Sequence, residues 1–195
     1  MKLFNKLTNI EISMIVAYDS QQGIGANNAL LWHIPSDMNW FKKETTNHIV
    51  VMGYNTYKDL CKYTKGKGLP NRINIVITKN NSHLVDPPCF TINDISQLEP
   101  LLLSKSFLQT SSQYFDLNKD KIYIIGGSQI YQHFLPYADE LVITEIKHKY
   151  DTTIFFPTFD KTLWKRTFLS IEENSLDKKN NIYIDLFYTK LKKIS

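Results

Sequence analysis

One carboxylate in this sequence stands among apolar side chains. Asp37 lies in the stretch GIGANNALLWHIPSDMNWFKK, residues 23–43, close to Trp32 and Phe41. The hydroxyl of Ser36 is placed to cap a helix whose first turn contains Asp37. A carboxylate at a helix start gains about 0.3–1 kcal/mol from the helix dipole without any function. Against aromatic walls it can also accept two hydrogen bonds from a planar, amidine-like ligand edge, which is a directional and charge-assisted pairing.

Glycine pairs provide a second kind of candidate chemistry. Gly126-Gly127 follows an apolar run and precedes Ser128, which can cap a helix, so backbone N–H groups could approach an anion there. Two glycines at a turn are more often only turn chemistry. The GIG motif at residues 23–25 lacks the third glycine of a dinucleotide-binding fingerprint, and the GKG motif at residues 66–68 lacks the ending of a P-loop.

Other reactive residues show no pattern that indicates a site. The five histidines never form an i,i+4 pair or an HExxH motif, so the sequence predicts no metal site. No Ser-His-Asp set, Cys-His pair or carboxylate dyad can be nominated from spacing. Cys61 and Cys89 are far apart without a CxxC motif, which is typical of reduced, buried cysteines in a cytosolic protein.

Length and charge exclude several classes of protein. A chain of 195 residues with 43% hydrophobic content can bury one substantial core. The net charge of +4, from 23 basic and 19 acidic residues, lacks the concentrated basic face of a nucleic-acid binder. No apolar run approaches the length of a membrane span, so a soluble cytoplasmic protein without nucleic-acid or membrane partners is expected.

Hydrophobic periodicity predicts strands alternating with helices, followed by antiparallel strands. This pattern is typical of an α/β fold with a mixed, mainly parallel central sheet, antiparallel C-terminal strands and helices on both faces. We expect one domain over residues 1–195, with an N-terminal extension at 1–11 and a loop insertion at 104–120. Strands are expected at residues 12–18, 48–53, 73–78, 89–92, 121–125, 138–148, 164–171 and 182–191. Helices are expected from residues 37, 55, 94 and 128, and irregular loops at 19–29 and 151–157.

The ordered segments ISMIVA, GIGANNALLWHIPSDMNWFK, VVMGYNTY, LPNRINIVIT, IYIIGGSQIYQHFLPYADELVIT and DTTIFFP are closely similar to dihydrofolate reductase. The resemblance covers residues 12–191 and favours the bacterial form of the family, which has Asp where Asp37 stands. It implies a single-domain enzyme that reduces 7,8-dihydrofolate to tetrahydrofolate by hydride transfer from NADPH, in support of one-carbon metabolism.

The resemblance also assigns the substrate site. Asp37 would bind the pteridine and promote protonation of the nitrogen beside the carbon that accepts the hydride, which agrees with the need to neutralise a nitrogen anion. Thr144 would support this network, and Trp32 would pack beside it. Arg72 would clamp the glutamate carboxylate bidentately. The wall of the pteridine and benzoyl groups would come from Ile15, Met38, Phe41, Leu60, Leu69 and Ile125.

A second set of residues is implied for the cofactor. Ala17 and Ile24 would face the nicotinamide, with Tyr131 against the same region. The family peptide between the two glycines is cis. The loop that closes over the cofactor would comprise Gly23, Ile24, Gly25, Ala26, Asn27, Asn28 and Ala29. The pyrophosphate would lie along Thr56, Gly126, Gly127, Ser128, Gln129 and Ile130, and Asn55 would also bind the cofactor.

The chain departs from the family pattern at the place where the extra phosphate of NADPH is often held. Tyr54-Asn55 stands where a basic residue is common, and Thr78 and Lys79 are the residues placed to compensate. Leu31 and Tyr57 replace a commoner proline and tryptophan.

Three alternatives stay open beside the reductase hypothesis. The first is a pyrimidine reductase of the riboflavin pathway, disfavoured by the run WHIPSD and by Arg72. The second is a catalytically silent binding protein on the same scaffold. The third is a nucleic-acid module, for which a basic stripe interleaved with aromatics is missing. The expected partners are therefore dihydrofolate and NADPH, and a monomer is expected.

Overall fold

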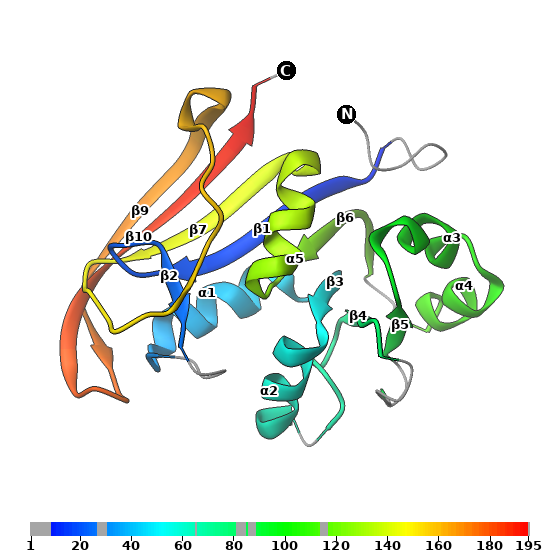
Figure 1. Ribbon diagram of the computed structural model, residues 1–195, viewed down its shortest axis with the longest axis horizontal. Helices are drawn as coiled ribbons and strands as arrows, with labels where there is room; N and C mark the ends of the chain where they lie inside the picture. Colours follow the sequence, from blue (N-terminus) through cyan, green and yellow to red (C-terminus); the bar gives the residue numbers. More distant parts are fainter. Residues whose placement is uncertain are drawn as a thin grey trace.

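An eight-stranded sheet runs through the molecule in the order β5-β4-β3-β6-β1-β7-β10-β9 (Figure 1). The computed structural model describes residues 9–26, 31–64, 66–80, 85, 89–113 and 117–194. Six neighbouring strands are parallel: β1 (Glu11–Tyr18), β3 (His48–Gly53), β4 (Ile73–Ile77), β5 (Phe90–Ile92), β6 (Asn118–Ile124) and β7 (Glu140–Ile146). The antiparallel end is β9 (Trp164–Asp177) and β10 (Ile182–Lys193), with β10 joined to β7. The predicted fold class is confirmed.

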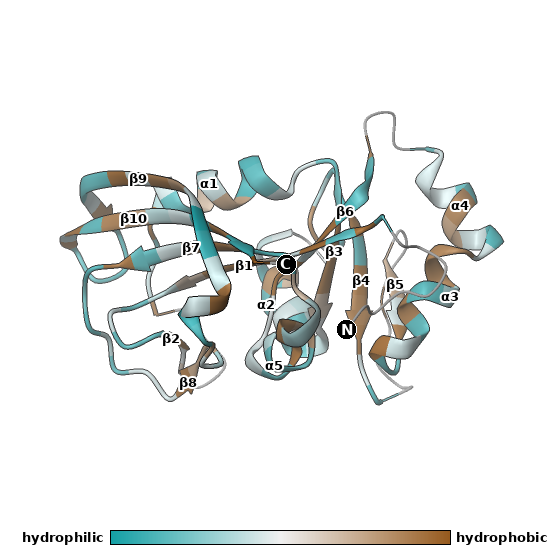
Figure 2. Ribbon diagram, turned by 90° about the horizontal axis from the view of Figure 1, so that it is seen from above, coloured by the Kyte–Doolittle hydropathy of each residue, from teal (hydrophilic) through white to brown (hydrophobic). Residues whose placement is uncertain are grey.

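Helices cover both faces of this sheet, with α1 on one side and α5 on the other (Figure 2). Alternation along β1 explains this, because successive side chains point to opposite faces. Met14 and Val16 share an apolar cluster with residues of α3 (Leu98–Leu102), α4 (Lys105–Ser111) and α5 (Ser128–Phe134). Ile15 shares another cluster with residues of α1 (Pro35–Thr45) and α2 (Tyr54–Thr64). Single 3-10 turns occupy Ile95–Gln97, Leu135–Tyr137 and Lys161–Leu163.

The predicted loop at residues 104–120 is wrong over most of its length. It contains α4, whose N-cap Ser104 accepts a hydrogen bond from the Phe107 N–H at 3.2 Å, and β6 begins at Asn118. Phe107 is 2% exposed and fixes the helix against α3 and the sheet. A short helix held by one aromatic side chain has too few apolar residues to show a helical period in the sequence.

Two predicted helix caps are also wrong. The N-cap of α1 is Ile34, with Pro35 at the first helical position, and the N-cap of α5 is Gly127. Neither N-cap makes a side-chain capping bond. Proline at the first turn presets the helical φ and has no N–H to satisfy, so α1 can begin two residues earlier than a serine cap would place it.

Both segments expected to be irregular contain a short strand. β2 (Gly23–Gly25) lies within the predicted loop at 19–29 and pairs antiparallel with β8 (Ile154–Phe155) from the predicted loop at 151–157. Residues 27–29 of that loop lie outside the described residues. A Cβ at Gly23 would lie 2.3 Å from Oγ1 of Thr152, so only glycine fits this close approach. None of the described helices is long and apolar enough to span a membrane.

Two buried carboxylates hold the loops at one end of the sheet. Asp19 accepts backbone N–H bonds from Gln21 and Gly23, both at 2.8 Å, and from Tyr150 at 3.0 Å. Asp177 accepts the Tyr150 hydroxyl at 2.7 Å and the His33 N–H at 2.9 Å. Tyr150 therefore joins the loop after β1 to the turn between β9 and β10.

Hydrogen bonding dominates the ionisation of Asp177. Burial raises its pKa, but bonds from the Asn180 side chain, the His33 N–H and the Tyr150 hydroxyl outweigh burial and lower the pKa to about 2. The carboxylate is therefore charged in the folded protein at neutral pH, and its partners must stay in place to keep it so.

Replacement of Tyr150 by Phe should test this connection. Tyr150→Phe keeps the ring but leaves the Asp177 carboxylate without one donor, so the free energy of unfolding should fall by about 1.5–3 kcal/mol at neutral pH. Denaturant unfolding measures the change. Tyr183→Phe is the matched control, because Tyr183 is 69% exposed and should tolerate the same deletion. Equal stability of both variants would contradict a stabilising role for the hydroxyl.

Candidate active site

Asp37 lies in the first turn of α1, where the helix meets the centre of the sheet. Its side chain is half-buried and forms a hydrogen bond with the side chain of Thr144 on β7. Thr144 is a register partner of Ala17 on β1, so the two predicted residues lie side by side on adjacent strands. Burial raises the pKa of Asp37 to about 6, and the bond with Thr144 opposes this rise. A carboxyl group tuned near neutrality can exchange a proton under ordinary conditions.

The predicted apolar wall is largely assembled in one place. Ile15, Leu69 and Ile125 are buried in one cluster, and Phe41 and Leu60 pack against it. These residues come from β1, the segment before β4, the end of β6, α1 and α2, so the fold brings together positions far apart in the chain. Met38 is 53% exposed, as a residue facing an open ligand site would be.

Trp32 lies in a neighbouring cluster with Ala17 packed against it. It is 6% exposed, and its ring centroid lies 5.2 Å from that of Tyr150. The loop that precedes α1 is thus fixed by the same tyrosine that links Asp19 and Asp177. The contact between Trp32 and Tyr150 holds the segment that leads into α1, the helix that carries Asp37.

Arg72 is buried near the C-terminal end of α1. Its Nε donates to Thr45 Oγ1 at 2.9 Å, Nη1 to the Pro70 carbonyl at 2.6 Å, and Nη2 to the Lys42 carbonyl at 3.3 Å and Thr46 Oγ1 at 3.2 Å. A guanidinium has five N–H donors, so four acceptors of the chain occupy most of them. A ligand carboxylate would therefore share Arg72 with the protein.

The segment that carries Leu69 and Arg72 is held by one buried amide. Asn74 accepts the Leu69 N–H at 2.9 Å and donates to the carbonyls of Leu69 at 3.0 Å and Arg72 at 3.2 Å. The side chain thus completes a backbone pairing that the loop cannot make with another strand. Gly68, at φ 66°, gives the turn its left-handed conformation.

Gly126-Gly127 lies at the end of β6, between α2 and α5. The peptide between the two residues is cis, as the family resemblance implies. A Cβ at Gly126 would lie 3.1 Å from the Tyr131 ring, and one at Gly127 would lie 3.5 Å from Thr56 Oγ1. The pair therefore keeps a backbone surface open beside the first turns of two helices, which suits a phosphate-bearing ligand.

The remaining predicted cofactor residues divide into those that pack and those that are exposed. Ile24 and Ile130 pack against the main core, and Ala26 and Thr78 are buried. Asn55, Lys79 and Gln129 are exposed. The Ser128 hydroxyl donates to the Phe155 carbonyl at 2.9 Å, so it ties α5 to β8. Asn27, Asn28 and Ala29 lie outside the described residues.

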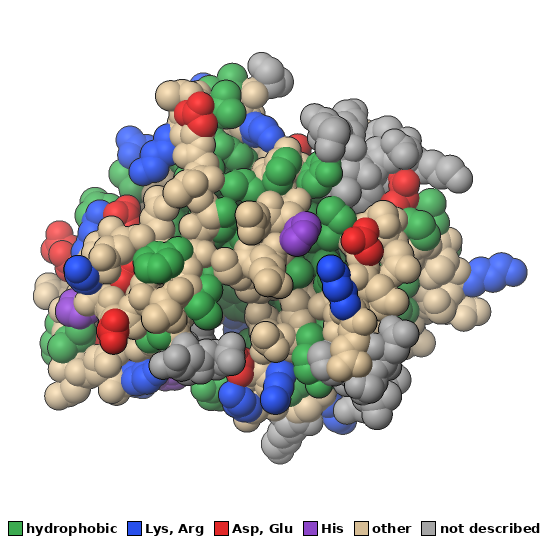
Figure 3. All heavy atoms as spheres, in the orientation of Figure 1, with side chains coloured by type: hydrophobic (Ala, Val, Ile, Leu, Met, Phe, Trp, Pro, Cys, Tyr) green, Lys and Arg blue, Asp and Glu red, His purple; other side chains and the backbone are tan. Residues whose placement is uncertain are grey.

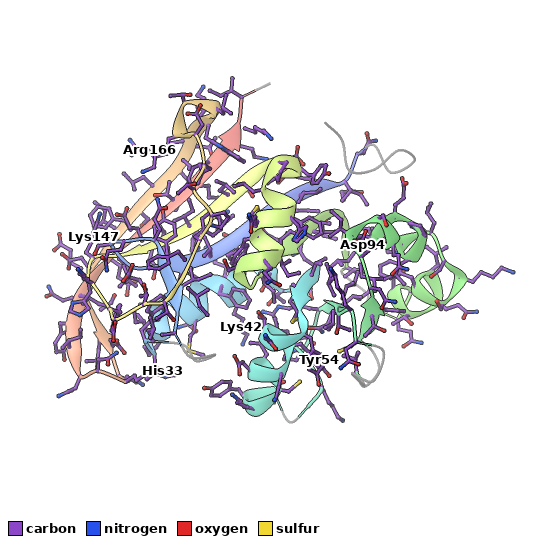
Figure 4. The ribbon with its side chains drawn as sticks, viewed as in Figure 1. His33, Lys42, Tyr54, Asp94, Lys147 and Arg166 are labelled. Carbon is purple, nitrogen blue, oxygen red and sulfur yellow. The ribbon has the colours of Figure 1, made fainter. Side chains whose placement is uncertain are left out.

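The surface reflects this arrangement. Figure 3 shows one face hollowed below α5, between β2 and α2. Figure 4 places Lys42 of α1 and Tyr54, the first residue of α2, below the lower end of α5 in the same view. The glycine pair lies between two of the elements that border this region, α2 and α5.

Comparison with known proteins agrees with this geometry. Residues 11–191 match the family described as dihydrofolate reductase. The chain belongs to the dihydrofolate reductase family.

Individual members of the dihydrofolate reductase family match over most of their length. The chain is 34% identical to dihydrofolate reductase of Bacillus subtilis over 169 residues, 87% of this chain and 88% of the relative. It is 33% identical to that of Buchnera aphidicola over 186 residues, 95% of this chain and all of the relative. A solved structure of Enterococcus faecalis dihydrofolate reductase, complexed with NADP(H) and RAB-propyl, has a TM-score of 0.70 and 25% identity, covering 95% of this chain and 97% of that one.

Sequence reasoning did not single out Tyr188, and it gave Tyr131 only a cofactor role. Tyr188 on β10 is the register partner of Thr144 on β7, and the negative charge of Asp37 contributes to raising the pKa of Tyr188, mainly raised by burial. Tyr131 from α5 is affected in the same way, and its hydroxyl donates to the Ile15 carbonyl at 2.6 Å. The register between β7 and β10 places Tyr188 beside Thr144, and no local sequence motif predicts that register.

The raised pKa of Asp37 predicts how a neutral replacement will affect stability. The folded-state pKa of Asp37, about 6, lies above the ordinary value of 3.8. The contribution of the protonated Asp37 side chain to the free energy of unfolding is therefore complete below pH 3.8 and is lost as pH rises through 6. Asp37→Asn should therefore raise the free energy of unfolding above that range, by at most about 3 kcal/mol and less to the extent that water reaches the carboxylate.

Below the ordinary pKa of an aspartate, the variant and the parent protein should be about equally stable. Denaturant unfolding across this pH range measures the difference. Asp151→Asn, at an exposed position, is the control for the same chemical change. A stability gain that does not vary with pH would contradict desolvation of Asp37 as the cause.

Proposed function

We propose that Asp37 is the proton-handling residue in the reaction of this enzyme, the reduction of 7,8-dihydrofolate to 5,6,7,8-tetrahydrofolate. A single observation carries the assignment: a half-buried carboxyl group with a pKa near 6 stands beside the apolar cluster, with a hydrogen bond from Thr144 to orient it. Hydride addition to a carbon next to a ring nitrogen leaves negative charge on that nitrogen unless a proton arrives. Asp37 favours the protonated pteridine through its charge and its hydrogen bonds.

The substrate has a defined place in this proposal. The flat ring and the benzoyl group lie against Ile15, Met38, Phe41, Leu60, Leu69 and Ile125, with Trp32 and Thr144 on the carboxylate side. The apolar wall excludes water around the reacting atoms, which strengthens the interaction with Asp37. Arg72, beyond Phe41 at 6.0 Å from its ring, pairs with the carboxylate tail.

The cofactor belongs beside the glycine pair. NADPH supplies the hydride when it is bound. Thr56, Gly126 and Gly127 fit its pyrophosphate, because side chains at either glycine would fill the space against Tyr131 or Thr56. Ala17 and Ile24 fit the nicotinamide, the described part of the loop, residues 23–26, covers it, and Ser128, Gln129, Ile130 and Tyr131 complete the wall. Asn55, Thr78 and Lys79 lie toward the adenosine end.

We further propose that the protein acts as a cytoplasmic monomer, with residues 1–195 forming one functional domain. Neither Cys61 nor Cys89 forms a disulfide bond, which suits a reducing compartment. The outer strand β9 carries exposed Phe168, Leu169 and Ile171, but Lys165, Arg166, Glu172 and Glu173 flank them. Charged residues on an edge strand discourage pairing with another chain.

Asp37→Asn should lose most of its turnover near neutral pH and recover part of it in acid, where solvent protonates the substrate. Oxidation of NADPH by purified protein with dihydrofolate measures both effects. The loss should be about 10²–10⁴-fold, the range for removal of a general acid–base. Unchanged activity at neutral pH would remove Asp37 from the mechanism. Absence of turnover in the parent protein, with NADPH or NADH, would favour a silent binding protein instead.

Lys79 should determine the preference between the two nicotinamide cofactors. Since Tyr54-Asn55 offers no positive charge, Lys79→Ala should raise KM for NADPH by about 3–10-fold, as expected for loss of one exposed charge–phosphate contact, and leave KM for NADH unchanged. Steady-state kinetics with both cofactors separates the effects. Lys161→Ala, an exposed lysine on a distant 3-10 turn, controls for net charge. An equal change in KM for both cofactors would contradict the role of Lys79.

A further inference from the structure

A network of hydroxyl and carboxyl groups lies behind Asp37 and outside the apolar wall. The Tyr188 hydroxyl donates to Glu172 Oε2 at 3.2 Å, and Ser175 Oγ donates to Glu172 Oε1 at 2.9 Å. Ser36 Oγ lies 3.3 Å from Ser175 Oγ and also within hydrogen-bonding distance of the Tyr188 hydroxyl, so its single proton can be donated to either oxygen. The network joins the residue before Asp37 to the two C-terminal strands.

The network is built into the fold. Tyr188 is 5% exposed and Ser175 is 6% exposed, so their hydroxyls need these partners. The Tyr188 ring lies 5.0 Å from that of Trp40 on α1, which fixes the phenol whether or not its hydroxyl is present. Ser36 does not cap α1, and its hydroxyl is used instead to attach the first turn of the helix to β9 and β10.

The network also shares its electrostatic environment with Asp37. Burial raises the pKa of Tyr188, the bond from Ser36 lowers it, and the negative charges of Glu172 and Asp37 raise it further. One phenol hydroxyl therefore senses both carboxylates. The titratable groups that face Asp37 include Tyr131 from α5 and Tyr188 from β10, with Glu172 of β9 behind Tyr188.

We propose that Tyr188 and Glu172 are positioning residues for Asp37, which set its orientation through Ser36 without contacting the substrate. The inference rests on the proposed role of Asp37. Tyr188 on β10 is the register partner of Thr144, the residue that hydrogen-bonds to Asp37. Glu172 accepts hydrogen bonds from the Tyr188 and Ser175 hydroxyls, so it fixes the two groups that hold Ser36 beside Asp37.

The test uses three variants: Tyr188→Phe, Glu172→Gln and the double variant that combines these two changes. Their control is Glu173→Gln, because Glu173 is an exposed neighbour that undergoes the same change of charge. Steady-state kcat and KM for dihydrofolate are measured from about pH 5 to pH 9, together with the thermal unfolding midpoint and the folded fraction. Asp37→Asn is assayed in the same series.

Tyr188→Phe should lower kcat at neutral pH by about 3–10-fold, the value of one hydrogen bond, with KM changed less than about twofold. Glu172→Gln should lower kcat at neutral pH by a similar factor, because an amide replaces one of the two acceptor oxygens that hold the Tyr188 and Ser175 hydroxyls. The double variant should lose no more than about the larger single loss, since both changes break one network. Glu173→Gln should match the parent protein.

Several results would overturn the proposal. Parent-like kcat and pH profiles for both Tyr188→Phe and Glu172→Gln would do so, as would losses equal to that of Glu173→Gln. Loss of kcat only in proportion to the folded fraction would assign the network to stability alone. If Asp37→Asn itself keeps full activity, the proposed role of Asp37 fails. Loss in Asp37→Asn with none in the network variants refutes only the positioning role.

Discussion

The partial desolvation of one carboxyl group is the constraint on which this structure depends. Asp37 must be dry enough for its pKa to rise toward 6, yet it must keep a hydrogen bond with Thr144 to stay oriented. These requirements oppose each other, because burial disfavours the charge that hydrogen bonding favours. The fold meets both by starting α1 with a proline above the centre of the sheet, beside the apolar cluster that contains Ile15 and Ile125.

The strand β7, at which the sheet changes from parallel to antiparallel pairing, also shapes the surroundings of Asp37. β7 is parallel to β1 on one side and antiparallel to β10 on the other. Thr144 therefore has Ala17 beside it on one strand and Tyr188 on the next. The parallel side faces the candidate nicotinamide position, and the antiparallel side leads to Glu172. The C-terminal third of the chain thus contributes to the environment of a residue in the first quarter.

Much of the fold and of the candidate site could be read from the sequence, because both depend on local patterns. Apolar runs such as residues 12–18 predicted the parallel strands, and the motifs around Asp37 and Gly126 indicated the family. The failures have physical causes. Ser36 looked like a cap because capping is judged locally, whereas its partner Ser175 is 139 residues away. Tyr188 and Glu172 were missed because strand register is a long-range property that no single segment encodes.

Arg72, the proposed partner of the substrate carboxylate, is already ordered by the fold. Its guanidinium is held by Thr45, Thr46 and two backbone carbonyls, so the long side chain has already lost its rotamer freedom in the folded state. An anion that reaches it has little side-chain ordering to bring about, which removes a usual entropic cost of association. In this proposed role, the affinity of Arg72 for a carboxylate would depend on the end of α1 as much as on the arginine itself. Loosening the two threonines would weaken binding without altering a single charge.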